Sequence, residues 1–253
     1  MAKQVEAWYN GLAMGPKGIL LESQAVKVGV MHEYRGSQGR VMFYYYNLAQ
    51  APLESFAVSM EETPALRTQV QEAPTRLDVG GQAQQQLMCE CMQPFTDSSE
   101  LTISFVLQGQ PHAYRLRLPV VACCFMEPVQ LAAADFMQRW EMLGGDHRQD
   151  LGDAYAGAPV DGARWAQVRG VISSGMRMGV TDGVEGVGPS TLFAAGTFKT
   201  GSTTPDGNKI AVGAMLRLDV DPPSGAYRIA CRAVHIKVAT ALKSILVAQL
   251  SGP

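Results

Sequence analysis

The sequence has no block of charges of one sign. Of its 253 residues, 21 are Lys or Arg and 23 are Asp or Glu, which gives a net charge of -2. Proteins that track a phosphate backbone usually gather basic residues on one face or along one segment. Because basic and acidic residues are mixed along this chain, we do not expect it to bind nucleic acid.

Long apolar runs are also missing. No segment approaches the roughly 18 to 20 apolar residues that a membrane-spanning helix needs. The N-terminal residues lack the charged-then-apolar pattern of a secretory signal. With 47% hydrophobic residues, however, the chain can form a large core. We therefore expect a soluble, cytosolic protein that does not insert directly into a membrane.

Cysteine is scarce and odd in number. Of the five cysteines, Cys123 and Cys124 are adjacent, and Cys89 and Cys91 are two positions apart. This spacing is not typical of the disulfide framework of a secreted domain. A Cys-x-Cys pair on a strand puts both thiols on one face, where buried cysteines act as small hydrophobic side chains and only occasionally hold zinc. We expect core cysteines, no metal and no other cofactor.

Familiar catalytic patterns are absent as well. There is no His-x-x-Glu-His spacing, no Gly-x-Ser-x-Gly turn and no pair of carboxylates on a helix face. The glycines around Gly186 and Gly188 lack the Lys-Ser/Thr pair of a nucleotide-binding loop. We predict that the chain is not an enzyme. The alternative from another functional class is an enzyme with an unrecognised site near His147 and Asp150.

The first half of the chain alternates apolar and polar residues with a period of two. Such segments, separated by turn residues, are typical of antiparallel strands. We expect strands at 26–30, 40–47, 53–60, 68–72, 84–91, 101–107 and 114–118. They predict an immunoglobulin-like antiparallel β-sandwich over residues 18–125. Residues 1–17 are expected to form an N-terminal arm or linker, with an added edge strand as one possibility.

The second half changes character. We expect helices at 135–143 and 238–250, and strands at 168–180, 190–198, 209–218 and 227–235, with a hydrophilic loop at 200–208. These elements predict an α+β platform subdomain over residues 126–253, in which helices flank an antiparallel sheet.

The helix expected at 135–143 has more apolar surface than one buried stripe requires. Phe136, Trp140 and Leu143 fall at i, i+4 and i+7, and Met137 adds a second apolar edge beside Trp140. The second edge either widens the buried face or offers a large aromatic side chain to a partner. The pattern does not decide between them.

Two later strands carry charged residues at alternating positions. If they pair in antiparallel fashion, Arg217, Asp219 and Arg228 fall on one surface. An ordinary solvated sheet face would show the same alternation, so periodicity leaves both interpretations open.

Several motifs together resemble a known family. They are Gly-Ile-Leu-Leu-Glu-Ser-Gln at 18–24, Glu-Tyr-Arg-Gly-Ser-Gln-Gly-Arg at 33–40, Gly-Gly-Gln-Ala-Gln-Gln-Gln at 80–86, Asp-Phe-Met-Gln-Arg-Trp at 135–140, Leu-Arg-Leu-Asp at 216–219 and Tyr-Arg at 227–228. In order and spacing they resemble the C-terminal appendage of alpha-adaptins, the large subunits of the plasma-membrane clathrin adaptor complex. The resemblance runs from about residue 18 to the end and implies a sandwich joined to a platform. The appendages of beta-type adaptins and of coatomer gamma share this architecture, but the Gln-Arg-Trp helix and the run at 80–86 favour alpha.

The resemblance implies that the platform binds short linear motifs of endocytic accessory proteins, of the Asp-Pro-Phe, Asp-Pro-Trp and Phe-x-Asp-x-Phe kinds. By position, the implied platform residues are Trp140 as an aromatic wall, Phe136 and Met137 as its apolar neighbours, Arg217 and Arg228 as cations, Asp219 as an orienting group, and Gln149 where the family carries an acid. Met137 stands where relatives carry a second Phe.

The resemblance also implies a second peptide site on the sandwich, for motifs of the Trp-x-x-Phe kind. The matching residues are Tyr44, which stands where the family has Phe, and Gln82. Further implied partners are the other adaptor subunits, contacted through a helical trunk that this chain lacks, and, indirectly, the clathrin coat. The implied location is the cytosolic face of the plasma membrane in coated pits, and the isolated fragment is expected to be monomeric.

Overall fold

The computed structural model describes residues 2–143, 149–155, 162–182, 190–221 and 223–250. It divides into two compact units, Met1–Gln93 with Asp97–Val121, and Pro94–Thr96 with Ala122–Pro253. The main break therefore falls between Val121 and Ala122, whereas the sequence pattern placed it between residues 125 and 126.

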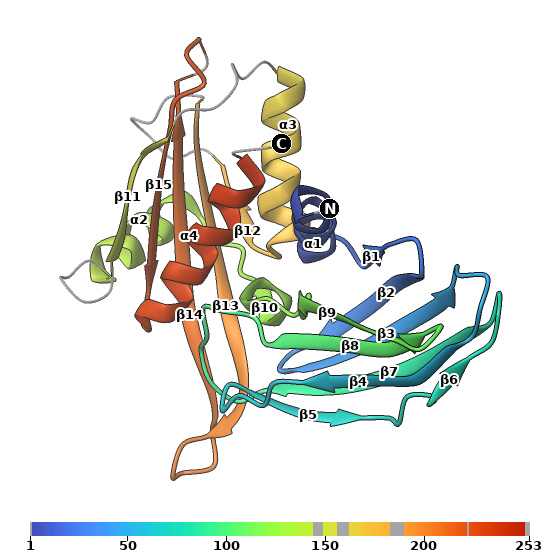
Figure 1. The fold of residues 1–253 in the computed structure, drawn as a ribbon. Coiled ribbons are helices and arrows are strands. Elements are labelled where there is room, and N and C mark those ends of the chain that lie inside the picture. The colour runs from blue at the N-terminus through green and yellow to red at the C-terminus, as the bar shows by residue number, and fades with distance from the viewer. Residues whose placement is uncertain (1, 144–148, 156–161, 183–189, 222, 251–253) are drawn as a thin grey trace. The chain divides into compact units, whose positions relative to one another are not determined.

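The first unit is a sandwich of two antiparallel sheets (Figure 1). One sheet has the order β1 (Lys17–Glu22), β2 (Val26–Arg35), β3 (Gln38–Asn47), β7 (Gln82–Cys91) and β5 (Leu66–Val70). The other has the order β6 (Arg76–Leu77), β4 (Leu53–Met60), β8 (Glu100–Leu107) and β9 (Gln110–Arg117). The predicted immunoglobulin-like architecture is confirmed.

Aromatic side chains form much of the sandwich core. Along β3, Val41, Phe43 and Tyr45 are buried at every second position, as the period of two requires. The Tyr45 ring meets Phe56 of the opposite sheet at a centroid distance of 5.2 Å, and its hydroxyl donates a hydrogen bond to Gln85 Oε1 at 2.6 Å. The buried hydroxyl is thus satisfied.

The N-terminal residues form a helix rather than the expected arm or edge strand. Helix α1 spans Ala2–Met14 and ends just before Gly15 and Pro16. Tyr9, Leu12 and Ala13 are buried, a spacing of i, i+3 and i+4 that belongs to a helix and not to a strand. The guanidinium of Arg117, from β9, lies 4.0 Å from the centre of the Tyr9 ring.

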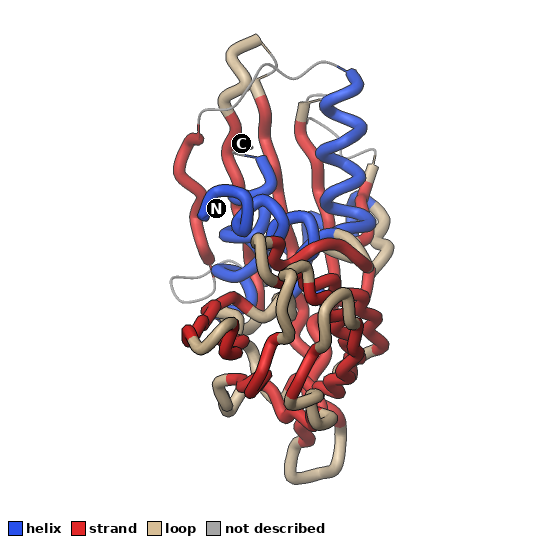
Figure 2. Tube along the Cα trace, turned by 45° about the vertical axis from the view of Figure 1, so that its right-hand side comes forward, coloured by secondary structure: helices blue, strands red, loops and turns tan. Residues whose placement is uncertain are grey.

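The second unit is the predicted α+β platform. Its antiparallel sheet has the order β10 (Met126–Pro128), β13 (Thr191–Thr203), β14 (Lys209–Val220), β15 (Tyr227–Ala233) and β11 (Gln149–Tyr155), and β12 (Gly179–Thr181) also pairs with β13. The helices are the short 3-10 turn Ala122–Phe125, α2 (Ala133–Met142), α3 (Gly162–Gly170) and α4 (Ile236–Leu250). Figure 2 shows these helices in blue and the strands in red.

The long strands of the platform are covered by different helices. Alternate residues of β14, such as Leu216 and Leu218, are fully buried, and α4 packs against β14 and β15. Met215, which precedes Leu216 and therefore lies on the opposite face of β14, belongs instead to the cluster around α2. Figure 1 shows α4 in front of the strands and α2 behind them. The central sheet is therefore buried on both faces where α2 crosses it.

The prediction of a strand at 168–180 is wrong. The segment contains the end of α3, a π-helical turn at Val171–Gly175 and only then the short strand β12. Val168, Ile172 and Met176 are buried and recur every four residues, which is helical spacing. The glycines at 170 and 175 obscured this period. A smaller difference is that β13 continues to Thr203, into the segment expected to be a loop.

The five cysteines are buried thiols, as expected for core residues. Burial raises the pKa of the Cys91 thiol to about 12, which leaves it protonated at neutral pH. Among the described residues, no helix is long and apolar enough to cross a membrane.

Two glycines on β12 and β14, which both pair with β13, give a matched test of the platform fold. A Cβ at Gly179 would overlap the backbone carbonyl group of Val129, whereas a Cβ at Gly213 would have no atom within 4 Å. We predict that Gly179→Ala lowers the free energy of unfolding by about 1–3 kcal/mol, the usual cost of overpacking. Gly213→Ala should leave it unchanged or raise it. Equal denaturation midpoints for the two variants would contradict this close approach.

Candidate functional site

Helix α2 is held to the sheet by an aromatic cluster. Phe136 is fully buried and Trp140 is 7% exposed, and both pack with Phe193, Ala195 and Met215 of the strands. The Phe136 ring lies 5.0 Å from Phe193 and 5.9 Å from Trp140, nearly parallel to the indole. Leu143 and Met137 are partly buried against the cluster. The apolar excess of this helix therefore widens its buried face.

The sheet register gathers charged residues beside this cluster. In the β14–β15 ladder, Asp219 pairs with Arg228, Arg217 with Ala230, and Met215 with Arg232. In the β13–β14 ladder, Phe193 pairs with Arg217. Because paired residues share a face of the sheet, all of these side chains lie on the face that carries α2. The arrangement of Arg217, Asp219 and Arg228 on one surface is the one that antiparallel pairing was expected to produce.

Asp219 fixes the orientation of Arg217. The Arg217 Nε donates to the two carboxylate oxygens of Asp219 at 2.9 and 3.1 Å, and the Thr191 hydroxyl donates to Asp219 Oδ1 at 2.8 Å. The guanidinium carbon lies 5.6 Å from the centre of the Phe193 ring. Within the described residues, the two terminal nitrogens of Arg217 make no hydrogen bond and no ion pair. They are the atoms that can meet a carboxylate.

Arg232 is a site residue that the sequence reasoning missed. Its guanidinium lies 4.2 Å from the centre of the Trp140 ring, and it donates a hydrogen bond to the Trp140 carbonyl oxygen. It follows Arg228 by four positions on β15, so strand alternation alone would have placed it on the same face. This was the available signal.

The electrostatics of this face favour an anion. Burial, and next the charge of Arg217, lower the pKa of Arg232 below its ordinary value, while Glu141 raises it. A guanidinium nevertheless stays protonated at neutral pH. Arg217, Arg228 and Arg232 thus outnumber the nearby acids Asp219 and Glu141. The face can hold a carboxylate next to an aromatic cluster.

The burial of Trp140 refines the role expected for it. The indole is stacked with Phe136 and covered by the Arg232 guanidinium, so little of it faces solvent. Met137, which is half-buried, and Arg228, which is exposed, are more accessible. Trp140 therefore packs beneath the surface of the site and offers little exposed area that a ligand could contact.

Three residues that the sequence analysis singled out are described only in part or not at all. Gln149 begins β11, where its backbone pairs with Arg232, but its side chain is not described. The same holds for the side chain of Asp150, and His147 lies outside the described residues altogether. Over the residues that are described, no three His, Cys, Asp or Glu side chains are grouped to hold a metal ion.

The expected second site lies on the outer face of the five-stranded sheet of the sandwich. Tyr44 is half-buried on β3, opposite Gly29 of β2 on one side and Gln84 of β7 on the other. Gln82 pairs with Tyr46, one step further along the same face. An added Cβ at Gly29 would approach Tyr44 Cβ to 3.7 Å, so the missing side chain leaves room beside the Tyr44 ring.

The family models that the chain matches and the relatives with similar sequences point to one family. Residues 16–115 match the family model of the adaptin C-terminal domain, and residues 124–250 match that of the alpha adaptin AP2 C-terminal domain. The AP-2 complex subunit alpha-2 of Dictyostelium discoideum is 28% identical over 99% of this chain and 24% of its own length. The AP-2 complex subunit alpha of Schizosaccharomyces pombe is 26% identical over 89% of this chain and 25% of its own length.

The chain spans about a quarter of the length of these relatives. The two family models follow each other along it, and the second alone covers half of the chain. The chain belongs to the alpha-adaptin C-terminal appendage family of the AP-2 clathrin adaptor.

Proposed function

We propose that the platform binds short acidic, aromatic peptide motifs of endocytic accessory proteins, such as Asp-Pro-Phe, Asp-Pro-Trp and Phe-x-Asp-x-Phe. The observation that carries this proposal is the group of three arginines, Arg217, Arg228 and Arg232, on the same sheet face as the Phe136–Trp140 cluster. A guanidinium fork suits a carboxylate, and a neighbouring apolar surface suits an aromatic ring. Membership of the alpha-adaptin family supports the same assignment.

The proposed biological role is recruitment of such proteins to forming clathrin coats at the cytosolic face of the plasma membrane. Through the rest of the adaptor, the appendage would connect to the other subunits and, indirectly, to clathrin. Single motifs of this size should bind with micromolar dissociation constants, or roughly 6–8 kcal/mol. Repeated motifs on one flexible protein would then gain strength by binding several appendages at once. No catalytic step or cofactor is part of this proposal.

The side site on the sandwich is proposed to bind Trp-x-x-Phe motifs. Tyr44 offers a half-buried ring beside the gap at Gly29, and glutamine amides border it. The register places Gln84 directly opposite Tyr44, so Gln84 is a better candidate than Gln82 for the amide that meets the peptide backbone.

Arg217→Ala tests the cationic part of the platform site. We predict that calorimetric titration with an Asp-Pro-Phe peptide gives micromolar binding to the parent protein and at least about tenfold weaker binding to the variant, or about 1.4 kcal/mol. The dependence of affinity on salt should also become flatter. Arg67→Ala, which removes an exposed arginine of the sandwich, is the control and should bind as the parent does. A variant with the affinity and salt dependence of the parent would show that the peptide's carboxylate binds elsewhere.

Trp140→Ala should affect both stability and binding. Because the indole is buried in the cluster, we predict a loss of about 3–5 kcal/mol in the free energy of unfolding, measured by chemical denaturation. At temperatures where the variant stays folded, affinity for the Asp-Pro-Phe peptide should fall by about 2 kcal/mol or more. Trp165→Ala is the matched control, since Trp165 lies on α3 and is only half-buried. Unchanged peptide affinity in folded Trp140→Ala would contradict the assignment of this site.

Tyr44→Ala separates the two sites. We predict that it weakens binding of a Trp-x-x-Phe peptide at least about fivefold, or about 1 kcal/mol. Binding of the Asp-Pro-Phe peptide should not change. Gln84→Ala should weaken the first peptide more than Gln82→Ala does. Equal effects of Tyr44→Ala on both peptides would argue against a separate sandwich site.

A further inference from the structure

Helix α2 has two flanks, and the proposed platform site uses only one of them. Residues of a helix advance by about 100° each. With Phe136 and Trp140 against the sheet, Met137 and Glu141 fall on one flank and Arg139, Met142 and Leu143 on the other. Glu141 interacts electrostatically with Arg232, which places the first flank beside the arginines. The second flank faces a different part of the sheet.

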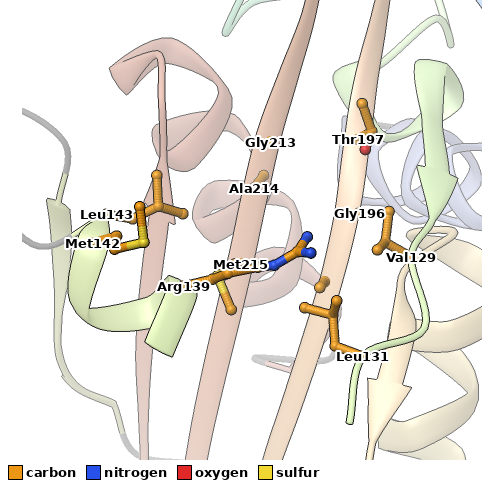
Figure 3. Close-up of a pocket in the computed structure, with 11 residues that line it drawn as sticks. Val129, Leu131, Arg139, Met142, Leu143, Gly196, Thr197, Gly213, Ala214 and Met215 are labelled. Atoms are coloured by element: carbon orange, nitrogen blue, oxygen red, sulfur yellow. The ribbon is translucent and has the colours of Figure 1, made fainter. Parts of the chain in front are cut away.

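A pocket of about 230 Å³ opens on this second flank. Figure 3 shows Arg139, Met142 and Leu143 of α2 on one side, Val129 and Leu131 of the preceding segment on the other, and β13 and β14 behind them. Apart from Arg139 and Thr197, the residues that line it are apolar or are the glycines Gly196 and Gly213. None of the platform residues inferred from the sequence lines this pocket.

The pocket is built on the same cluster that holds the platform site. Val129, Leu131 and Leu143 pack against the Phe136–Trp140 cluster, and Met215 belongs to the cluster and lines the pocket as well. The floor is β14 at Gly213, where an added Cβ would meet no atom within 4 Å. Because residue 213 is a glycine, the part of the pocket that a larger side chain would fill stays open.

Size and charge define the ligand. An engineered apolar cavity of about 150 Å³ holds a benzene molecule, so a phenyl ring or a leucine side chain fits here. Arg139 is exposed at the rim, and among the described residues it makes no ion pair, not even with Asp135 one turn earlier. Met142 beside it is 72% exposed. An apolar pocket with a charged guanidinium at its edge matches an apolar side chain that has a carboxylate next to it.

We propose that this pocket is a second peptide site of the platform, which takes one large apolar side chain of an extended segment with an adjacent acidic residue. The site rests on the proposed function, because its ligand belongs to the same class of acidic, aromatic peptides. Its position on the opposite flank of α2 lets the appendage engage two such motifs, or two parts of one long segment, through a single helix.

Methionine methyl resonances distinguish the two flanks. Met137 reports on the platform site and Met142 on the pocket, and each can be assigned with a Met→Leu variant. The probe is a blocked peptide with the central sequence Asp-Phe-Asp, and the control peptide has Ala in place of Phe. We expect both methyl signals to shift saturably with the probe, and neither to shift with the control peptide.

Two variants test the pocket directly. Gly213→Val should fill the floor without disturbing the backbone, and Arg139→Gln should remove the charge at the rim. Each variant should raise the dissociation constant measured from the Met142 methyl shift at least about tenfold. The dissociation constant measured from the Met137 shift, and the affinity for an Asp-Pro-Phe peptide, should not change. The melting temperature of Gly213→Val should match or exceed that of the parent, which shows that any loss of response comes from filling the pocket.

The remaining outcomes would overturn the proposal in distinguishable ways. If the Met137 signal shifts and the Met142 signal does not, the pocket proposal is contradicted and the proposed platform function stands. If neither signal shifts, both are contradicted. A response of Met142 that is the same in Gly213→Val would place the ligand outside the pocket. A Met142 signal that moves with protein concentration, without peptide, would identify a second copy of the chain as the occupant.

Discussion

The packing of α2 on the sheet is the constraint on which the platform depends. Phe136, Trp140 and Phe193 form a continuous aromatic contact between the helix and β13, and Arg232 covers the indole from β15. A guanidinium over a desolvated indole contributes up to about 2 kcal/mol, which offsets part of the cost of burying the charge. The same contact sets the position of both helix flanks. Any ligand that binds beside α2 therefore meets a surface whose geometry is fixed by this core.

The sequence predicted the fold where one periodicity dominated. Strand β4 was expected at 53–60 and is observed there, and α2 was expected within two residues of its observed bounds. In β4 the apolar residues alternate from Phe56 to Met60, after an irregularity at Ser55, and in α2 Phe136 and Trp140 keep the helical spacing. At 168–180 the pattern was ambiguous, because glycines break the helical recurrence of Val168, Ile172 and Met176. Local propensity pointed to a strand there, and packing of the buried side chains determined the helical turns instead.

The candidate site could be predicted only in part, for a similar physical reason. Alternation along β14 and β15 was enough to place Arg217, Asp219 and Arg228 on one face. It gave no information about which helix would cover that face, so the contact of Arg232 with Trp140 was not foreseen. The pocket at Gly213 was equally hidden, since it arises from three segments that are distant in the sequence. Such features depend on tertiary packing, which a pattern of one strand or helix does not contain.

The burial of Trp140 bears on how a motif would be bound. With Phe136 and Arg232 in contact with the indole, an aromatic ring bound as proposed would meet Met137 and the arginine side chains before it reached the indole itself. Methionine is flexible and polarizable, so Met137 can adapt its shape to rings of different size. A Phe at that position would offer a more rigid surface. Met in place of Phe would then widen the range of accepted motifs and lower the preference for any one of them, which would suit the proposed binding through many weak contacts.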